Sequence, residues 1–382
     1  MGVTTSTQSV YARVVLPLLL IATACTEPVP APWLAASTAA GDLNGFAVGR
    51  DGSLWGWGCS PLGDGTRMDG NTPVRIGTGY TAVAPGTNHV LALKVDGTLW
   101  AWGDNSYDAV GDGTDQERLA PVPIGSGFSA VAAAAYHSLA LKPDGTLWAW
   151  GDDYYGQLGP TGVDLATSPR QVHLTFQVAK VATGRAHTLA IATDGALWGW
   201  GDNSLGQLDG IPTGPRNSPR QLGTDYVAVA AGSSHSLALT VDGTLWAWGD
   251  NTHGALGIGT ADPVSGPVAV RTGVAAMAAG THASVAVTTD GVLLAWGFND
   301  MGQLGEGTLV DRLAPVEIGR GYTSVSMGPR VWYPAITPSR SFALAVTTGG
   351  VVKNSWGSNG YGTLGDATWN DRSAPGRVAL PR

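Results

Sequence analysis

The sequence YVAVAAGSSHSLALTVDGTLWAWGDNTHGALGIGTADPVSGPVAV, residues 226–270, contains the signals that decide the fold. Leu237 and Leu239 alternate with small residues, and Trp246 and Trp248 alternate with other apolar side chains. This period of two is typical of β-strands, because successive side chains of a strand point to opposite faces. The segment therefore predicts a series of short strands.

An Asp-Gly pair joins two of these predicted strands. Asp242-Gly243 predicts a hairpin with a type I′ turn, whose central residues need a positive φ that glycine adopts without strain. The pair recurs along the chain, and Gly349-Gly350 takes its position near the C-terminus. The other copies are Asp51-Gly52, Asp96-Gly97, Asp144-Gly145, Asp194-Gly195 and Asp290-Gly291.

The motif Trp-x-Trp-Gly shows that the whole segment is an internal repeat. Five full copies and two altered copies have their second tryptophan at Trp57, Trp102, Trp150, Trp200, Trp248, Trp296 and Trp356. Successive copies are 45, 48, 50, 48, 48 and 60 residues apart. The chain thus consists of seven similar units.

A lone four-stranded sheet leaves both faces uncovered, so units of this length must stack on one another. Seven stacked and twisted sheets close into a ring. Twelve of the fifteen tryptophans lie in the repeated motifs, and we expect them in the core, where each indole buries on the order of 200 Å². The sequence therefore predicts an all-β, seven-bladed β-propeller.

The repeated string Gly-x-x-His-Ser-Leu-Ala-Leu-x-x-Asp-Gly-x-Leu-Trp-Ala-Trp-Gly-Asp-Asn-x-x-Gly-Gln-Leu-Gly resembles the regulator-of-chromosome-condensation repeat. The resemblance covers about residues 34–382 and implies the same seven-bladed propeller. It also implies a ring closed by pairing strands from both ends of the domain. Here the expected closing pieces are Trp33 to Ser37 and Arg377 to Leu380.

The N-terminus has the pattern of an export signal. A polar start with Arg13 precedes an apolar run from Val14 to Ala22, which is shorter than the roughly 20 residues of a membrane span. The sequence Ala-Thr-Ala-Cys that ends at Cys25 resembles a bacterial lipoprotein signal, which implies cleavage before Cys25 and attachment of a lipid to its thiol. Ala22 stands where leucine is usual, so simple secretion after cleavage near Cys25 stays open.

Three regions follow from these patterns. We expect a signal peptide over residues 1–24, a proline-rich tether over 25–33 and the propeller over 34–382. The protein is then exported and either anchored at the cell envelope by its lipid or secreted.

The net charge argues against a nucleic-acid partner. It is −8, and loss of the single positive charge of Arg13 with the signal would make it −9. An acidic surface without a basic stripe repels phosphate backbones. The founding member of the resembled family is a nucleotide exchange factor that binds chromatin, and for an exported acidic chain this activity is the least expected.

Four histidines occupy one position of the repeat: His89, His137, His187 and His235. Sevenfold geometry spreads equivalent positions around the ring, whereas a metal or catalytic site needs its groups close together. We expect these histidines to make structural hydrogen bonds. The aspartates after the tryptophan motif are expected to form turns. They are Asp104, Asp152, Asp153, Asp202 and Asp250.

The chain lacks the motifs of common enzyme classes. It contains no Gly-x-Ser-x-Gly elbow, phosphate loop, calcium loop or His-Glu-x-x-His sequence, and two cysteines cannot form a zinc site. We therefore expect no catalytic activity, no cofactor and no bound metal.

An insertion in the seventh unit, residues 329–341, is the most individual stretch of the chain. Its Arg330, Trp332, Tyr333 and Arg340 are of the residue types common at interface hot spots, and we predict that they bind a partner. A drifted loop folded over the blade edge is the alternative. Further aromatic residues lie in loops after the tryptophan motif, namely Trp369, Tyr107, Tyr154, Tyr155 and Tyr361.

A secreted propeller with related repeats inhibits β-lactamase, so the resemblance implies that a rim of such a ring can bind another protein. We predict a monomeric, non-catalytic scaffold for an unidentified protein partner, with the membrane contacted only through the lipid. The alternative is a carbohydrate-binding or glycan-hydrolysing propeller, in which loop tyrosines stack on sugars and paired carboxylates cleave them.

Overall fold

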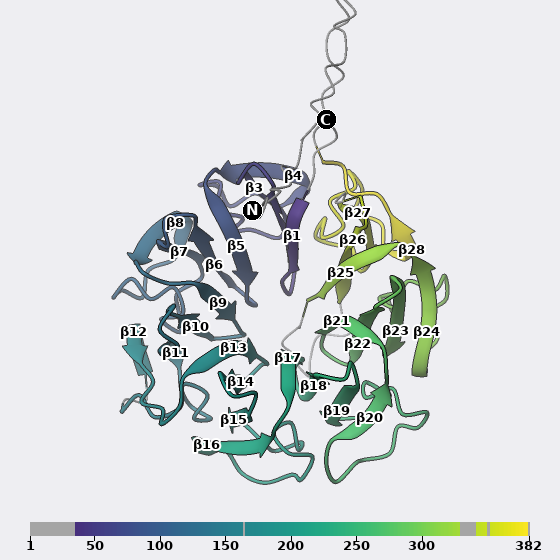
Figure 1. The fold of residues 1–382 in the computed structure, drawn as a ribbon. Coiled ribbons are helices and arrows are strands. Elements are labelled where there is room, and N and C mark those ends of the chain that lie inside the picture. The colour runs from purple at the N-terminus through teal and green to yellow at the C-terminus, as the bar shows by residue number, and fades with distance from the viewer. Residues whose placement is uncertain (1–34, 163–164, 329–340, 350–351, 381–382) are drawn as a thin grey trace, which may run out of the picture. The chain divides into compact units, whose positions relative to one another are not determined.

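The computed structural model describes residues 35–162, 165–328, 341–349 and 352–380. These residues form seven four-stranded antiparallel sheets, arranged as blades around a ring (Figure 1). The predicted all-β, seven-bladed propeller is therefore confirmed. The described part of the chain holds no helix of the length and apolarity that a membrane crossing requires.

The strands of every blade follow one another along the chain. Blades 1 to 4 contain β1 (Ala35–Ala40), β2 (Asn44–Gly49), β3 (Leu54–Gly58) and β4 (Gly70–Gly77); β5 (Tyr80–Pro85), β6 (His89–Lys94), β7 (Leu99–Gly103) and β8 (Arg118–Gly125); β9 (Ala130–Ala133), β10 (His137–Leu141), β11 (Leu147–Asp152) and β12 (Leu165–Gln171); and β13 (Val178–Thr183), β14 (His187–Ala192), β15 (Leu197–Gly201) and β16 (Arg216–Gly223). Blades 5 to 7 contain β17 (Tyr226–Ala231), β18 (His235–Thr240), β19 (Leu245–Gly249) and β20 (Val268–Arg271); β21 (Val274–Ala279), β22 (Ala283–Thr288), β23 (Val292–Gly297) and β24 (Arg312–Arg320); and β25 (Tyr322–Met327), β26 (Phe342–Thr347), β27 (Val352–Gly357) and β28 (Arg372–Gly376).

The antiparallel order gives the ring two different ends. The loops between first and second strands and between third and fourth strands lie at one end, which we call the long-loop end. The Asp-Gly turns and the connections between blades lie at the other, which we call the turn end. Figure 1 shows the first strand of each blade nearest the ring centre.

Ring closure differs from the expectation. Within the described residues the two predicted closing pieces do not pair: β1 pairs with β2 of its own blade, and the chain after β28 lies against its own blade, where Ala379 N donates to Gly365 O at 2.7 Å. Blades 7 and 1 instead meet through side chains, with Trp57, Phe342 and Val378 in one buried cluster. No strand needs to be exchanged because this cluster covers the faces of both blades.

The Asp-Gly turns also differ from the expected type I′. At the first turn, Gly52 N donates to Gly49 O at 3.0 Å and Gly49 N donates to Ser53 O at 2.7 Å. Gly52 has a φ of +76°, whereas Asp51 is not among the described residues with positive φ. This pattern is a type I turn followed by a glycine bulge, which Asp51 supports by accepting a hydrogen bond from Ser53 N at 3.0 Å.

The second tryptophan of each motif is the core residue of its blade. All seven, from Trp57 to Trp356, have no exposed surface, while the first tryptophan of the full motifs is half-buried. Six of the seven donate Nε1 to a backbone carbonyl in the third-to-fourth-strand loop of the preceding blade. Trp57 closes the ring in this way, since it donates to Thr363 O of blade 7 at 2.9 Å. The prediction of the tryptophans as core is confirmed for these residues.

Four joints between blades carry a further chain of hydrogen bonds. In the joint of blades 5 and 6, Ser284 Oγ and Trp296 Nε1 both donate to Ala255 O, and His235 Nε2 lies 2.9 Å from Ser284 Oγ. Because the single hydroxyl proton goes to the carbonyl, the histidine must donate from Nε2. The equivalent pairs are His89 with Ser138 at 2.7 Å, His137 with Thr188 at 3.4 Å and His187 with Ser236 at 3.1 Å.

These histidines have the structural role that the sequence predicts. All four are buried, and burial lowers the pKa of His89 to about 4 and that of the other three to about 3. They are therefore neutral at physiological pH, which suits a hydrogen-bonding role inside the joint.

Candidate functional site

Most of the predicted binding loop lies outside the described residues, as does Cys25. Arg330, Trp332, Tyr333 and Arg340 all fall within residues 329–340. The remaining residue of that prediction, Trp369, lies in the loop between β27 and β28 at the long-loop end. Its side chain is 50% exposed, so it is available to a partner.

The aspartates after the tryptophan motif form turns. Asp104 Oδ1 accepts from Ser106 N at 3.0 Å, and Asp202 Oδ1 accepts from Ser204 N at 2.9 Å. The following asparagine holds the rest of the loop: Asn203 Oδ1 accepts from Leu208 N at 2.8 Å, and its Nδ2 donates to Ile211 O at 3.0 Å. These bonds make the long loops rigid supports for the side chains at their tips.

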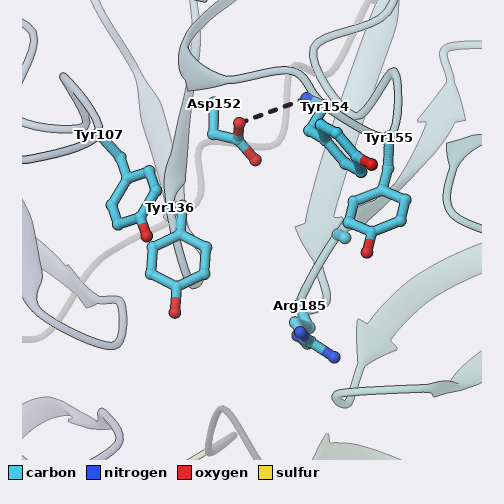
Figure 2. A pocket seen from close by; sticks show the side chains of 7 residues that line it. Tyr107, Tyr136, Asp152, Tyr154, Tyr155 and Arg185 are labelled. Atoms are coloured by element: carbon cyan, nitrogen blue, oxygen red, sulfur yellow. Dashed lines mark hydrogen bonds between the residues drawn. The ribbon is translucent and has the colours of Figure 1, made fainter.

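A pocket opens at the long-loop end between the loops of blades 2, 3 and 4 (Figure 2). Its volume is about 220 Å³. Seven residues line it: Tyr107, Tyr136, Asp152, Tyr154, Tyr155, Arg185 and Ala186. Three of the loop tyrosines predicted from the sequence thus come together, whereas Tyr361 and Trp369 belong to blade 7.

The four tyrosines form two pairs on either side of the opening (Figure 2). The ring centroids of Tyr107 and Tyr136 are 4.2 Å apart, and those of Tyr154 and Tyr155 are 4.9 Å apart. Tyr107 is 45% exposed and Tyr154 is 82% exposed. Such exposure of apolar rings on rigid loops is typical of a binding surface.

The two charged groups of the pocket differ in their surroundings. Asp152 is held by its own loop, since Oδ2 accepts from Gln157 Nε2 at 2.7 Å and Oδ1 accepts from Tyr154 N at 3.3 Å. Arg185 lies at the opposite edge of the opening, is exposed, and makes no ion pair or hydrogen bond with any other described residue.

Other arginines near this end are paired with acids of the long loops. The described pairs are Arg67 with Glu117, Arg118 with Asp112, Arg216 and Arg220 with Asp209, Arg312 with Glu306, and Arg372 with Asp366. Arg185 is therefore an exception in its own neighbourhood.

Tyr136 and Arg185 were not predicted from the sequence, although the repeat contains a signal for both. Blades 2 and 5 have Asn88 and Ser234 at the position of Tyr136. The position of Arg185 holds threonine or serine in three other blades, namely Thr87, Ser233 and Thr281. The departures from the repeat thus gather in one place.

Blades 5 and 6 bring a second polar group to the long-loop end. His282 Nδ1 lies 3.2 Å from Asp250 Oδ2, and His253 Nδ1 lies 3.4 Å from Asp311 Oδ2. Within the described ranges, no three acidic, histidine or cysteine side chains are arranged to hold a metal ion. The two pairs adjoin one another, since the ring centroids of His253 and His282 are 5.1 Å apart.

The family description "Regulator of chromosome condensation (RCC1) repeat" matches residues 96–141, 144–191, 194–239, 242–287 and 290–330, which is more than half of the chain. The chain belongs to this family. A second description of the RCC1 repeat matches residues 80–108, 128–157, 178–207, 226–255 and 274–303. A comparison with curated protein sequences found no match.

Solved structures of RCC1-type propellers resemble the chain in fold. Prp20p from Saccharomyces cerevisiae, described with its binding to Gsp1p and histones, has a TM-score of 0.74 and 22% identity over 91% of this chain and 88% of its own. The same yeast protein bound to Kap60 has a TM-score of 0.74 and 20% identity over 97% and 91%. Human WBSCR16 has a TM-score of 0.71 and 22% identity over 83% and 86%. At these identities the likeness shows the RCC1 fold alone.

Proposed function

We propose that this RCC1-repeat propeller is a non-catalytic, protein-binding scaffold that uses its long-loop end as the binding face. The observation that carries the proposal is the uneven placement of exposed apolar side chains. Of the thirteen large ones among the described residues, eight lie in third-to-fourth-strand loops. They are Met68, Tyr107, Tyr154, Leu205, Ile211, Leu309, Val310 and Trp369.

The turn end is different, because only Val95 and Val241 of that set lie in its Asp-Gly turns. The third-to-fourth-strand loops are also much longer than the Asp-Gly turns, so the long-loop end presents the larger loop surface to a partner. Exposed apolar side chains gathered on one face are typical of a protein interface. Rigid loops also reduce the entropy that a partner's binding must overcome.

Carbohydrate binding is the second candidate, and the tyrosine pairs of the pocket favour it, because sugar rings stack on aromatic faces. Hydrolysis is not supported by the pocket, since Asp152 is the one acid among its lining residues and glycoside cleavage needs two carboxylates. The exchange activity of the family's founding member is the least expected function, because the chain is acidic and its N-terminal sequence has the pattern of an export signal.

The binding face is tested by capture of partners from an envelope extract with the purified protein. The variant Leu309→Ser/Trp369→Ser removes two exposed apolar side chains from the long-loop end, and Val95→Ser/Val241→Ser removes two from the turn end. We expect the first variant to lose a captured protein that the second retains, and the purified partner to bind with at least tenfold lower affinity. Equal capture by both variants would contradict the assignment of the face.

Anchoring at the envelope is part of the same proposal. We propose that cleavage exposes Cys25 and that its thiol carries the lipid, with residues 25–33 as the tether. Growth with labelled palmitate should label the protein but not a Cys25→Ser variant. Release of unlabelled native protein into the medium would instead support simple secretion.

A further inference from the structure

The tyrosine pocket differs from the rest of the long-loop end in its charge. Arginines elsewhere at this end neutralise an acid of a long loop, whereas Arg185 faces an opening without a described partner. The one acid in the pocket, Asp152, is engaged by its own loop. The charged group that the pocket offers to a ligand is therefore the Arg185 guanidinium, beside the neutral hydroxyl groups of the tyrosines.

The pocket is also lined by aromatic rings on two sides (Figure 2). A cavity of about 150 Å³ accommodates benzene, so a volume of about 220 Å³ leaves room for one ring and a small polar group. Tyrosine pairs bind a flat apolar group by stacking and edge contacts. A guanidinium binds a carboxylate through two parallel N–H bonds.

The fold does not require the tyrosine and arginine that distinguish this pocket. Tyr154 stands where blades 2 and 4 have Ser106 and Ser204, and Arg185 stands where blades 2 and 6 have Thr87 and Thr281. Since those blades fold with small residues at the same positions, packing does not require tyrosine or arginine there. The substitutions instead meet around one opening, although they come from adjacent blades.

We propose that the pocket formed by Tyr107, Tyr136, Tyr154, Tyr155 and Arg185 is the anchoring subsite for an acidic, aromatic segment of the protein partner. The proposal rests on the proposed function. The partner's aromatic ring lies between the tyrosine pairs, and a carboxylate of the same segment lies on the Arg185 guanidinium. The ligand chemistry of the subsite is thus a flat ring that carries a carboxylate.

Three small probes of different charge test this chemistry on the purified protein. Phenylacetate carries the ring and the carboxylate, phenethylamine carries the ring and a cation, and galacturonate carries a carboxylate on a sugar. Ligand-observed NMR titrations measure binding of each. We expect phenylacetate to bind most tightly of the three.

The variants separate the charge from the rings. Arg185→Gln should weaken the binding of phenylacetate about tenfold, because it removes a charge-assisted hydrogen bond. Its matched control is Arg50→Gln, an exposed arginine in a turn at the other end of the ring, which should have no effect. Tyr154→Ser, which introduces the residue found at this position in blades 2 and 4, should weaken the binding of phenylacetate several-fold.

Each contrary outcome has a distinct meaning. Tighter binding of phenethylamine would overturn the anionic assignment and make the pocket a cation cage. Tighter binding of galacturonate would identify the ligand of the pocket as an acidic sugar and not a protein segment. An unchanged affinity in Arg185→Gln, or no binding of phenylacetate, would overturn the subsite.

Capture of the protein partner distinguishes failure of this proposal from failure of the proposed function. If Arg185→Gln weakens phenylacetate but captures the partner as the native protein does, the pocket is not the partner's anchor. If Leu309→Ser/Trp369→Ser also captures normally, the long-loop face itself is the wrong assignment.

Discussion

The joints between blades 2 to 6 and the seam between blades 7 and 1 solve the same packing problem in different ways. In the joints, a buried histidine donates to a hydroxyl of the next blade. At the seam the histidine position holds Phe342 and the hydroxyl position holds Gly45, and the buried cluster there is apolar apart from the Trp57 hydrogen bond. Both partners are missing together.

The joint of blades 6 and 7 follows the same rule, with Ala283 and Ala343 at the two positions. A buried polar group left without its partner costs free energy, whereas the loss of both groups is nearly neutral. At these two joints the pair across the joint therefore varies as a unit, whereas the joint of blades 1 and 2 keeps the polar Asn44 opposite Val90. A single repeat, considered alone, does not show this.

The largest expected effect is that of low pH, which should destabilise the joints that contain a histidine but not the apolar seam. Burial lowers the pKa of the joint histidines to about 3 or 4, whereas an unfolded-chain histidine titrates near 6.5. Below about pH 6.5 the unfolded chain binds protons that the folded chain does not, so the free energy of unfolding falls as the pH decreases. The loss is up to about 1.4 kcal/mol per pH unit for each histidine, and on the order of ten kcal/mol for four histidines by pH 4.5.

The double variant His187→Ala/Ser236→Ala sharpens that result, because it copies the pair at the joint of blades 6 and 7. Urea unfolding at pH 7 and pH 4.5 should show a pH dependence reduced by about a quarter relative to the native protein. An unchanged dependence would mean that this joint histidine does not carry its share of the acid sensitivity.

Breaking one pair should have an intermediate effect. Ser284→Ala leaves His235 Nε2 buried without an acceptor, and we expect a loss of about 1 to 3 kcal/mol in the free energy of unfolding at pH 7. Adding His235→Ala should cost less than the sum of the two single variants. Strict additivity in this double-mutant cycle would show that the pair is not coupled.

The smallest effect concerns the tryptophan hydrogen bond. Trp200 Nε1 donates to Gln157 O at 3.0 Å, whereas Trp102 Nε1 is buried with no acceptor among the described residues. Trp200→Phe should therefore destabilise the protein by about 1 kcal/mol more than Trp102→Phe, because only the former removes a buried hydrogen bond, although Gln157 O still accepts from Thr188 Oγ1. Equal losses in thermal or urea unfolding would assign the role of both tryptophans to packing alone.

The sequence predicted the propeller because its repeat period is recorded in large residues such as Trp248 that must be buried in every unit. It did not predict the turn type, because Asp51-Gly52 places one residue at positive φ but does not say how many residues separate the paired strand ends. The wrong closure came from the resemblance, since nothing in Arg377–Leu380 specifies which blade it meets.

The pocket was predicted only in part for a related reason. Tyr107 and Tyr154 are 47 residues apart, and only the ring geometry places their loops side by side. A single arginine such as Arg185 does not indicate a site by itself. Its place in a pocket becomes evident only when the same position is compared across blades and its neighbours are found to be tyrosines.

Closure without strand exchange has a consequence for how such a protein can originate. Each blade is encoded by one uninterrupted segment, so duplication of that segment adds a complete sheet with its own tryptophan and its own half of a joint. In a propeller closed by a strand from each terminus, the last blade depends on both ends of the gene. Here a duplicated unit can pack directly against its neighbours, and only the residue pairs at its two joints have to change.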